Sequence, residues 1–108
     1  GHQRVEAALA ETVMSTVNLA EIVTSLINKG IPAADARRTT ESLEIETVPL
    51  DRELALAAGV LREGTRSHGL SLGDRACLAL GRHLALPVLT ADRTWADLDV
   101  GIEIQLIR

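Results

Sequence analysis

Residues 70–80, LSLGDRACLAL, place one acidic residue at the head of an otherwise apolar run. Ser71 and Asp74 have the spacing of a capping box, in which side chain and backbone groups bond reciprocally at a helix start. The apolar residues that follow predict a helix over residues 71–84, with one face in the core. Asp74 lies at the edge of that apolar arc, beside Leu78, where a carboxylate faces a cleft more readily than open water. Capping and a working role at a site both stay open for Asp74.

On both sides of this helix, the sequence alternates between apolar, β-branched runs and stretches of helical spacing. Strands are predicted at residues 13–16, 45–50, 86–91 and 101–108. The other helices are predicted at residues 3–11, 18–29, 32–43 and 51–69. Strands interleaved with helices, the last strands nearly all apolar, predict one α/β domain with a parallel sheet covered by helices on both faces.

The composition narrows the classes of function. A chain of 108 residues fits one small domain, and its core must be built from Ala, Leu, Val and Ile because Phe and Tyr are absent. The net charge of -4 argues against general polyanion binding, so nucleic acid would need a local basic patch. One cysteine cannot form an internal disulfide, and no apolar run reaches ~18 residues. We therefore expect a soluble cytoplasmic protein without membrane contact.

Acidic residues follow the predicted strands or open the helices at the carboxyl edge of the sheet, where sites form in such folds. Glu21 lies in the first turn after residues 13–16, Asp74 opens its own helix, and Asp92 directly follows residues 86–91. Local structure also explains them, because Asn18 and Glu21 have capping-box spacing and Asp is common in turns. For each acid taken alone, both interpretations remain open.

Several acids in one crevice would form a metal site. Mg²⁺ prefers oxygen ligands, usually one or two carboxylates plus water, and a dication relieves the repulsion between carboxylates. Metal-ion catalysis of phosphodiester cleavage uses such a cluster to activate water and stabilise the leaving oxygen. Arg75 and Arg93 each directly follow a candidate acid, so both are candidate phosphate contacts, with solvated arginine as the alternative.

The sequence lacks the motifs of several other common active sites and cofactor sites. The sequence has no Gly-x-x-x-x-Gly-Lys loop and no Gly-x-Gly-x-x-Gly fingerprint. Its histidines do not have metal-ligand spacing and are expected at exposed polar positions: His2, His68 and His83. Cys77 and Trp95 are expected in the core rather than at a reactive or base-stacking position.

Three segments, STVNLAE, LSLGDRACLAL and LPVLTADRTW, resemble the PIN-domain family, specifically its VapC-like toxin branch. The resemblance covers nearly the whole chain and implies a small α/β ribonuclease with a parallel sheet, cleaving RNA with Mg²⁺ or Mn²⁺. The family's conserved acids fall on Glu21, Asp74 and Asp92, and Asp97 is a possible further acid. The family also implies a dimeric toxin that a cognate antitoxin holds inactive by covering the acidic site.

One departure from the family concerns its first strand. Family members begin with a strand ending in an Asp-x-Ser/Thr motif, which supplies a first catalytic Asp on the central strand. Nothing before Gln3 can form such a strand, and no acid precedes Glu6. We therefore expect residues 1–108 to form a single PIN-like domain that is N-terminally incomplete and a poor nuclease by itself. The alternative function is a non-catalytic module of the same fold that binds an antitoxin or itself through its apolar helices.

Overall fold

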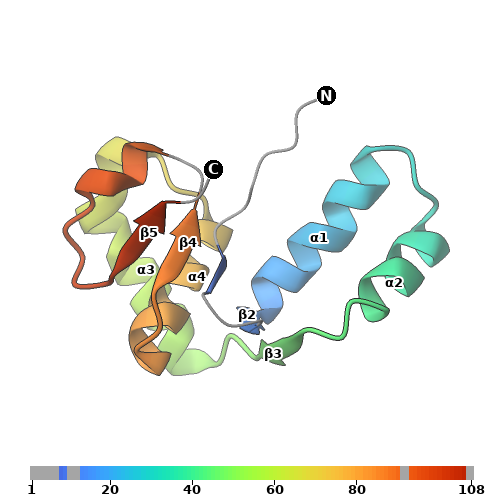
Figure 1. Ribbon diagram of the computed structural model, residues 1–108, viewed down its shortest axis with the longest axis horizontal. Coiled ribbons are helices and arrows are strands. Elements are labelled where there is room, and N and C mark those ends of the chain that lie inside the picture. Colours follow the sequence, from blue (N-terminus) through green and yellow to red (C-terminus); the bar gives the residue numbers. More distant parts are fainter. Residues whose placement is uncertain (1–7, 10–12, 91–92, 107–108) are drawn as a thin grey trace.

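A computed structural model describes residues 8–9, 13–90 and 93–106. Within these ranges, helices alternate with short strands along the chain (Figure 1). The α-helices are α1 (Thr16–Asn28), α2 (Ala33–Glu41), α3 (Arg52–Thr65) and α4 (Leu72–Leu84). The strands are β1 (Ala8–Leu9), β2 (Val13–Ser15), β3 (Glu46–Val48), β4 (Val88–Thr90) and β5 (Ile104–Leu106). Two 3₁₀ helices, η1 (Arg66–His68) and η2 (Arg93–Asp97), follow α3 and β4.

Parallel strand pairs form the sheets, as predicted for an α/β chain. β2 pairs with β3, and β4 pairs with β5, both in parallel. These pairs belong to two sheets rather than one, a two-stranded sheet and a three-stranded sheet of order β1-β4-β5. β1 pairs antiparallel with β4, so the helix predicted for residues 3–11 is wrong at Ala8 and Leu9. Pairing with the edge of β4 satisfies backbone groups there and overrides the local helical pattern; the rest of that predicted helix lies outside the described residues.

Helix α4 runs through the core between α3 and β4. Its centre is almost wholly buried, with Leu78 0% and Leu80 1% exposed, and Val88 of β4 is also 0% exposed. Trp95 is 2% exposed in the same core cluster, which confirms its predicted place. Burial of this apolar surface is the main favourable contribution to folding, at roughly 25 cal/mol per Å².

Side-chain caps set the starts of α3 and α4 where the sequence predicts them. The Asp51 carboxylate accepts from the Leu54 backbone N–H at 2.9 Å. Ser71 and Asp74 form the full capping box, with both bonds at 3.1 Å. Between the two helices, Gly69 adopts φ 62°, a left-handed conformation that glycine takes at little cost and that turns the chain into α4.

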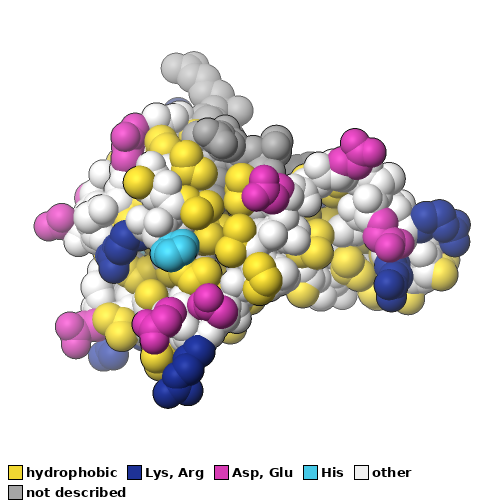
Figure 2. All heavy atoms as spheres, turned by 90° about the horizontal axis from the view of Figure 1, so that it is seen from below, with side chains coloured by type: hydrophobic (Ala, Val, Ile, Leu, Met, Phe, Trp, Pro, Cys, Tyr) yellow, Lys and Arg dark blue, Asp and Glu magenta, His cyan; other side chains and the backbone are white. Residues whose placement is uncertain are grey.

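Helices α1 and α2 form a helical hairpin that projects from the body, and we call residues 16–41 the arm (Figure 1). Its apolar residues are only partly covered. In α1, Leu19, Ile22, Val23 and Leu26 are half-buried, and Ile27 is 44% exposed. Figure 2 shows apolar side chains along the arm, with charged side chains towards its free end. The arm thus leaves apolar surface open to solvent.

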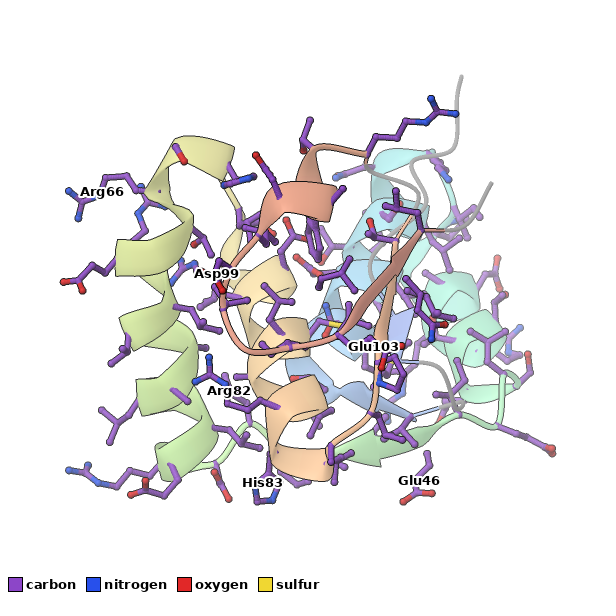
Figure 3. All side chains as sticks on the ribbon, turned by 60° about the vertical axis from the view of Figure 1, so that its left-hand side comes forward. Glu46, Arg66, Arg82, His83, Asp99 and Glu103 are labelled. Atoms are coloured by element: carbon purple, nitrogen blue, oxygen red, sulfur yellow. The ribbon has the colours of Figure 1, made fainter. Side chains whose placement is uncertain are left out.

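A polar contact ties α4 to the segment between η2 and β5. The Arg82 guanidinium donates to the Val100 carbonyl oxygen at 2.5 Å, and Figure 3 shows Arg82 extending from α4 on that side.

Among the described helices, none has the length and apolar character needed to span a membrane.

The core position of α4 predicts a large difference between two leucines of that helix. We expect Leu78→Ala to lower the free energy of unfolding by about 2–5 kcal/mol, because a cavity replaces a fully buried side chain. Leu72→Ala, at a position that is 52% exposed, should cost less than about 1 kcal/mol. Urea denaturation of both variants measures the difference, and equal losses would contradict this packing.

Candidate active site

The predicted acids Glu21 and Asp74 come from helices α1 and α4, whose first turns lie against each other. α1 begins earlier than predicted, because Ser15 is its N-cap and accepts from the Val17 N–H at 3.2 Å. The capping box predicted for Asn18 and Glu21 is therefore wrong. Asn18 lies inside the helix, and its side chain is available for a tertiary contact.

The Asn18 carboxamide connects the two helices. Its Nδ2 donates to Glu21 Oε1 at 3.1 Å and to the Gly73 carbonyl oxygen at 3.1 Å. Gly73 is buried in the first turn of α4, and a Cβ there would overlap the Glu21 carboxylate. Glycine therefore makes the space into which the Glu21 side chain fits.

Asp74 is the next residue along α4. Its Oδ2 accepts from the Ser71 backbone N–H, so the capping interpretation of Asp74 is confirmed. That bond leaves Oδ1 without a hydrogen bond among the described residues. A negative charge in the first turn of a helix is also favoured by the helix dipole.

The Cys77 thiol lies close to the carboxylates of both Asp74 and Glu21. Burial, together with the negative charges of Asp74 and Glu21, raises the pKa of Cys77 from 9.0 to about 12. Both carboxylates must be near this thiol to act on it, since charge interactions weaken with distance. Glu21 and Asp74 are therefore brought to one place. Cys77 itself is a buried core residue, 3% exposed, as predicted.

The other predicted acids are placed differently. Asp92 lies outside the described residues. Asp97, in η2, accepts from His68 Nε2 at 2.7 Å, and this hydrogen bond is the main reason that the pKa of Asp97 lies below its usual value. The His68 side chain is only 16% exposed, so the prediction of an exposed polar position is wrong for His68. No sequence signal pairs these two residues, since they meet only through the fold.

The two predicted phosphate contacts also differ in their surroundings. Arg75 is half-buried, and its Nη1 donates to the Ala58 carbonyl oxygen of α3 at 3.1 Å. Arg93 is exposed at the start of η2. It borders a pocket of about 370 Å³ between η1 and η2, whose lining residues are Ser67, His68, Arg93, Thr94, Ala96 and Asp97.

The donor set suits a hard divalent cation. Glu21 and Asp74 supply carboxylate oxygens, and Mg²⁺ sites commonly use one or two protein carboxylates completed by water. The buried Oδ1 of Asn18 has no hydrogen-bond partner among the described residues, so one hydrogen-bond acceptor next to Glu21 is unsatisfied. No group of three or more His, Cys, Asp or Glu side chains arranged for a metal occurs in residues 8–9, 13–90 and 93–106.

Comparison with known proteins identifies the family of this chain. A PIN-domain family model matches residues 1–101 of the chain. The chain belongs to the PIN-domain family. It is 32% identical, over 114 aligned residues, to ribonuclease VapC5 of Mycobacterium tuberculosis, an alignment that covers 100% of this chain and 84% of that protein. The VapC-like resemblance drawn from the sequence segments is thereby confirmed.

A solved structure supports the same PIN relationship. The crystal structure of a member of the VapBC family of toxin–antitoxin systems, VapBC-5 from Mycobacterium tuberculosis, matches with a TM-score of 0.59 and 29% identity. The match covers 87% of this chain and 79% of that one. The predicted PIN-like α/β fold is thus confirmed by sequence and by structure.

Two residues of this site were not predicted as functional. Asn18 has the appearance of a cap in the sequence, and Gly73 looks like an ordinary position of the capping box. A glycine in the first turn of a buried helix was the one available signal, because glycine often marks the close approach of another group.

The raised pKa of Cys77 predicts alkaline destabilisation. The unfolded thiol ionises near 9.0, whereas the folded thiol stays protonated until about 12, so stability is lost as the pH rises between these values. From about pH 8 to about pH 11 the loss should be about 2–3 kcal/mol, at roughly 1.4 kcal/mol per unit over the two units above 9.0. Urea denaturation at both pH values measures it.

The composition makes this measurement clean, because the chain has no tyrosine and a single lysine, Lys29. Cys77→Ala should remove most of the pH dependence, while Lys29→Met should keep it. An unchanged slope in Cys77→Ala would show that other groups are responsible.

Proposed function

We propose that this chain is a metal-dependent endoribonuclease toxin of a toxin–antitoxin pair, acting in the cytoplasm. The observation that carries the proposal is the packing of the Glu21 carboxylate of α1 against Gly73, the residue directly before Asp74 in α4. Membership of the PIN-domain family and similarity to ribonuclease VapC5 support RNA as the substrate class.

Glu21 and Asp74 would hold Mg²⁺ or Mn²⁺ through carboxylate oxygens, together with Asp92. Asp97 instead accepts from His68 and does not join Glu21 and Asp74 in a group of three among the described residues. When bound, such a cation lowers the pKa of a water molecule and stabilises negative charge at the phosphate. The chain's own residues orient the carboxylates. Asp74 is held by the Ser71 N–H, and Glu21 is held by the Asn18 amide.

Phosphate contacts are proposed at two arginines. Arg93 is exposed beside the pocket between η1 and η2, where a guanidinium can meet the RNA backbone. Arg75 has its Nη1 engaged with Ala58, so a phosphate would be met by Nη2. Both positions follow a proposed metal ligand directly in the sequence.

Asp74→Asn tests the catalytic proposal. The Asn oxygen can still accept from the Ser71 N–H, so the helix cap is kept while the charge is lost. We expect the Mn²⁺-dependent cleavage of single-stranded RNA, which is weak in a chain expected to be a poor nuclease by itself, to fall to background. The control Asp35→Asn removes a charge from the exposed face of α2 and should leave cleavage unchanged. Equal cleavage by all three proteins would favour the non-catalytic binding module instead.

The arm is the proposed surface for the antitoxin. Helix α1 buries only Asn18, a polar residue, while its apolar stripe stays half-exposed. An apolar segment of a partner would remove this surface from water, which is favourable in proportion to the area covered. Similarity to VapBC-5, a member of a family of toxin–antitoxin systems, supports an antitoxin as the occupant. A homodimer through the same helices is the competing arrangement.

Ile27→Asp tests the arm. Ile27 is 44% exposed, so the fold should tolerate the charge, whereas a bound apolar partner should not. We expect affinity for the cognate antitoxin to fall by about tenfold or more. Val60→Asp on α3, where Val60 is 74% exposed, is the matched control and should bind normally. Light scattering of both variants shows whether a homodimer is lost instead.

A further inference from the structure

Asn18 is the single buried residue of α1, all of which the structure describes, and it is 8% exposed. The apolar residues of the same helix are less buried than this carboxamide. Burial of a polar side chain is unfavourable unless its groups are hydrogen-bonded. The placement of Asn18 therefore needs a reason other than core packing.

The two halves of the carboxamide are used unequally. Nδ2 makes both of its hydrogen bonds, one to Glu21 Oε1 within α1 and one to the Gly73 carbonyl oxygen in α4. Oδ1 is buried without a hydrogen-bond partner among the described residues. An unpaired buried acceptor destabilises a protein, so Asn18 is a poorer choice for stability than an apolar residue of the same size.

Gly73 completes the arrangement from the opposite side. A side chain at this position would occupy the space of the Glu21 carboxylate, because an added Cβ would meet both carboxylate oxygens. Glu21 is thus held by a donor from its own helix and fits a space that only glycine leaves open in α4. The Asn18 hydrogen bond thus holds the carboxylate in the space beside Gly73.

The chemistry of the donor matters as much as its position. Glu21 and Asp74 are like charges near the same thiol, and like charges repel. The Asn18 amide holds Glu21 by a hydrogen bond and adds no positive charge, whereas a lysine or arginine at this position would add one. We propose that Asn18 is a positioning residue that fixes Glu21 against Gly73, beside Asp74, for a divalent cation. Binding of a cation by Glu21 and Asp74 rests on the proposed function.

Asn18→Leu separates positioning from packing, because leucine keeps the volume and removes both donors. We expect Mn²⁺ affinity, measured by the free-ion electron paramagnetic resonance signal, to fall about tenfold or more. The thermal midpoint without metal should change little, because the loss of the two Nδ2 hydrogen bonds is offset by removal of the unpaired Oδ1. A merely structural Asn18 would instead give a lower midpoint and unchanged Mn²⁺ affinity, which would overturn the proposal.

Matched controls come from the same elements. Asn28→Leu makes the same chemical change at an exposed position of α1 and should keep Mn²⁺ affinity. Gly73→Ala should lower the affinity as Asn18→Leu does, whereas Gly59→Ala, where a Cβ meets nothing within 4 Å, should not. Normal Mn²⁺ affinity in Gly73→Ala would contradict the role given to the space at Gly73.

A metal-free measurement distinguishes failure of this inference from failure of the proposed function. In the wild type, the Asn18 side-chain amide protons should exchange slowly by NMR, unlike those of exposed Asn28, and Glu21→Ala should speed their exchange. If the wild type binds no Mn²⁺, the proposed function fails, and slow exchange still supports Asn18 as the anchor of Glu21. Exchange as fast as that of Asn28 would overturn the inference, whatever the Mn²⁺ result.

Discussion

The close approach of α1 and α4 at Gly73 is the constraint on which the candidate site depends. Two helices distant in sequence can meet there because one of them has no side chain at the contact. The hydrogen bond from Asn18 to the Gly73 carbonyl oxygen then fixes their relative position. Glu21 fills the space that results, so glycine at position 73 leaves room for a carboxylate beside α4.

Helix starts carry the chemistry of this fold. Ser15 and Ser71 cap α1 and α4, and each cap lies a few residues before an acid of the candidate site. Asp74 lies in the first turn of α4, where backbone N–H groups and the helix dipole favour negative charge. Glu21 lies beyond the first turn of α1, and its position depends on the contact with Asn18 and Gly73 instead.

Local rules in the sequence were sufficient for α4 and insufficient for α1. The Ser71–Asp74 box and the apolar run after it predict α4 within a residue, because capping and periodicity are local. The same spacing at Asn18 and Glu21 predicted a capping box that does not form. The helix begins earlier, because Ser15 is its N-cap, and the Asn18 amide makes a tertiary hydrogen bond to Gly73 instead. Residues 8–9 look helical in sequence and form a strand because the edge of β4 offers hydrogen bonds.

The sequence by itself determined the α/β order of elements, the PIN family, the core place of Cys77 and Trp95, and the nomination of Glu21 and Asp74. These follow from patterns within one element or from segments in a recognisable order. Only the tertiary structure decided that Asn18 anchors Glu21, that Gly73 makes its space, and that His68 pairs with Asp97. These contacts depend on how separate elements pack, and no periodicity along the chain encodes distance across a fold.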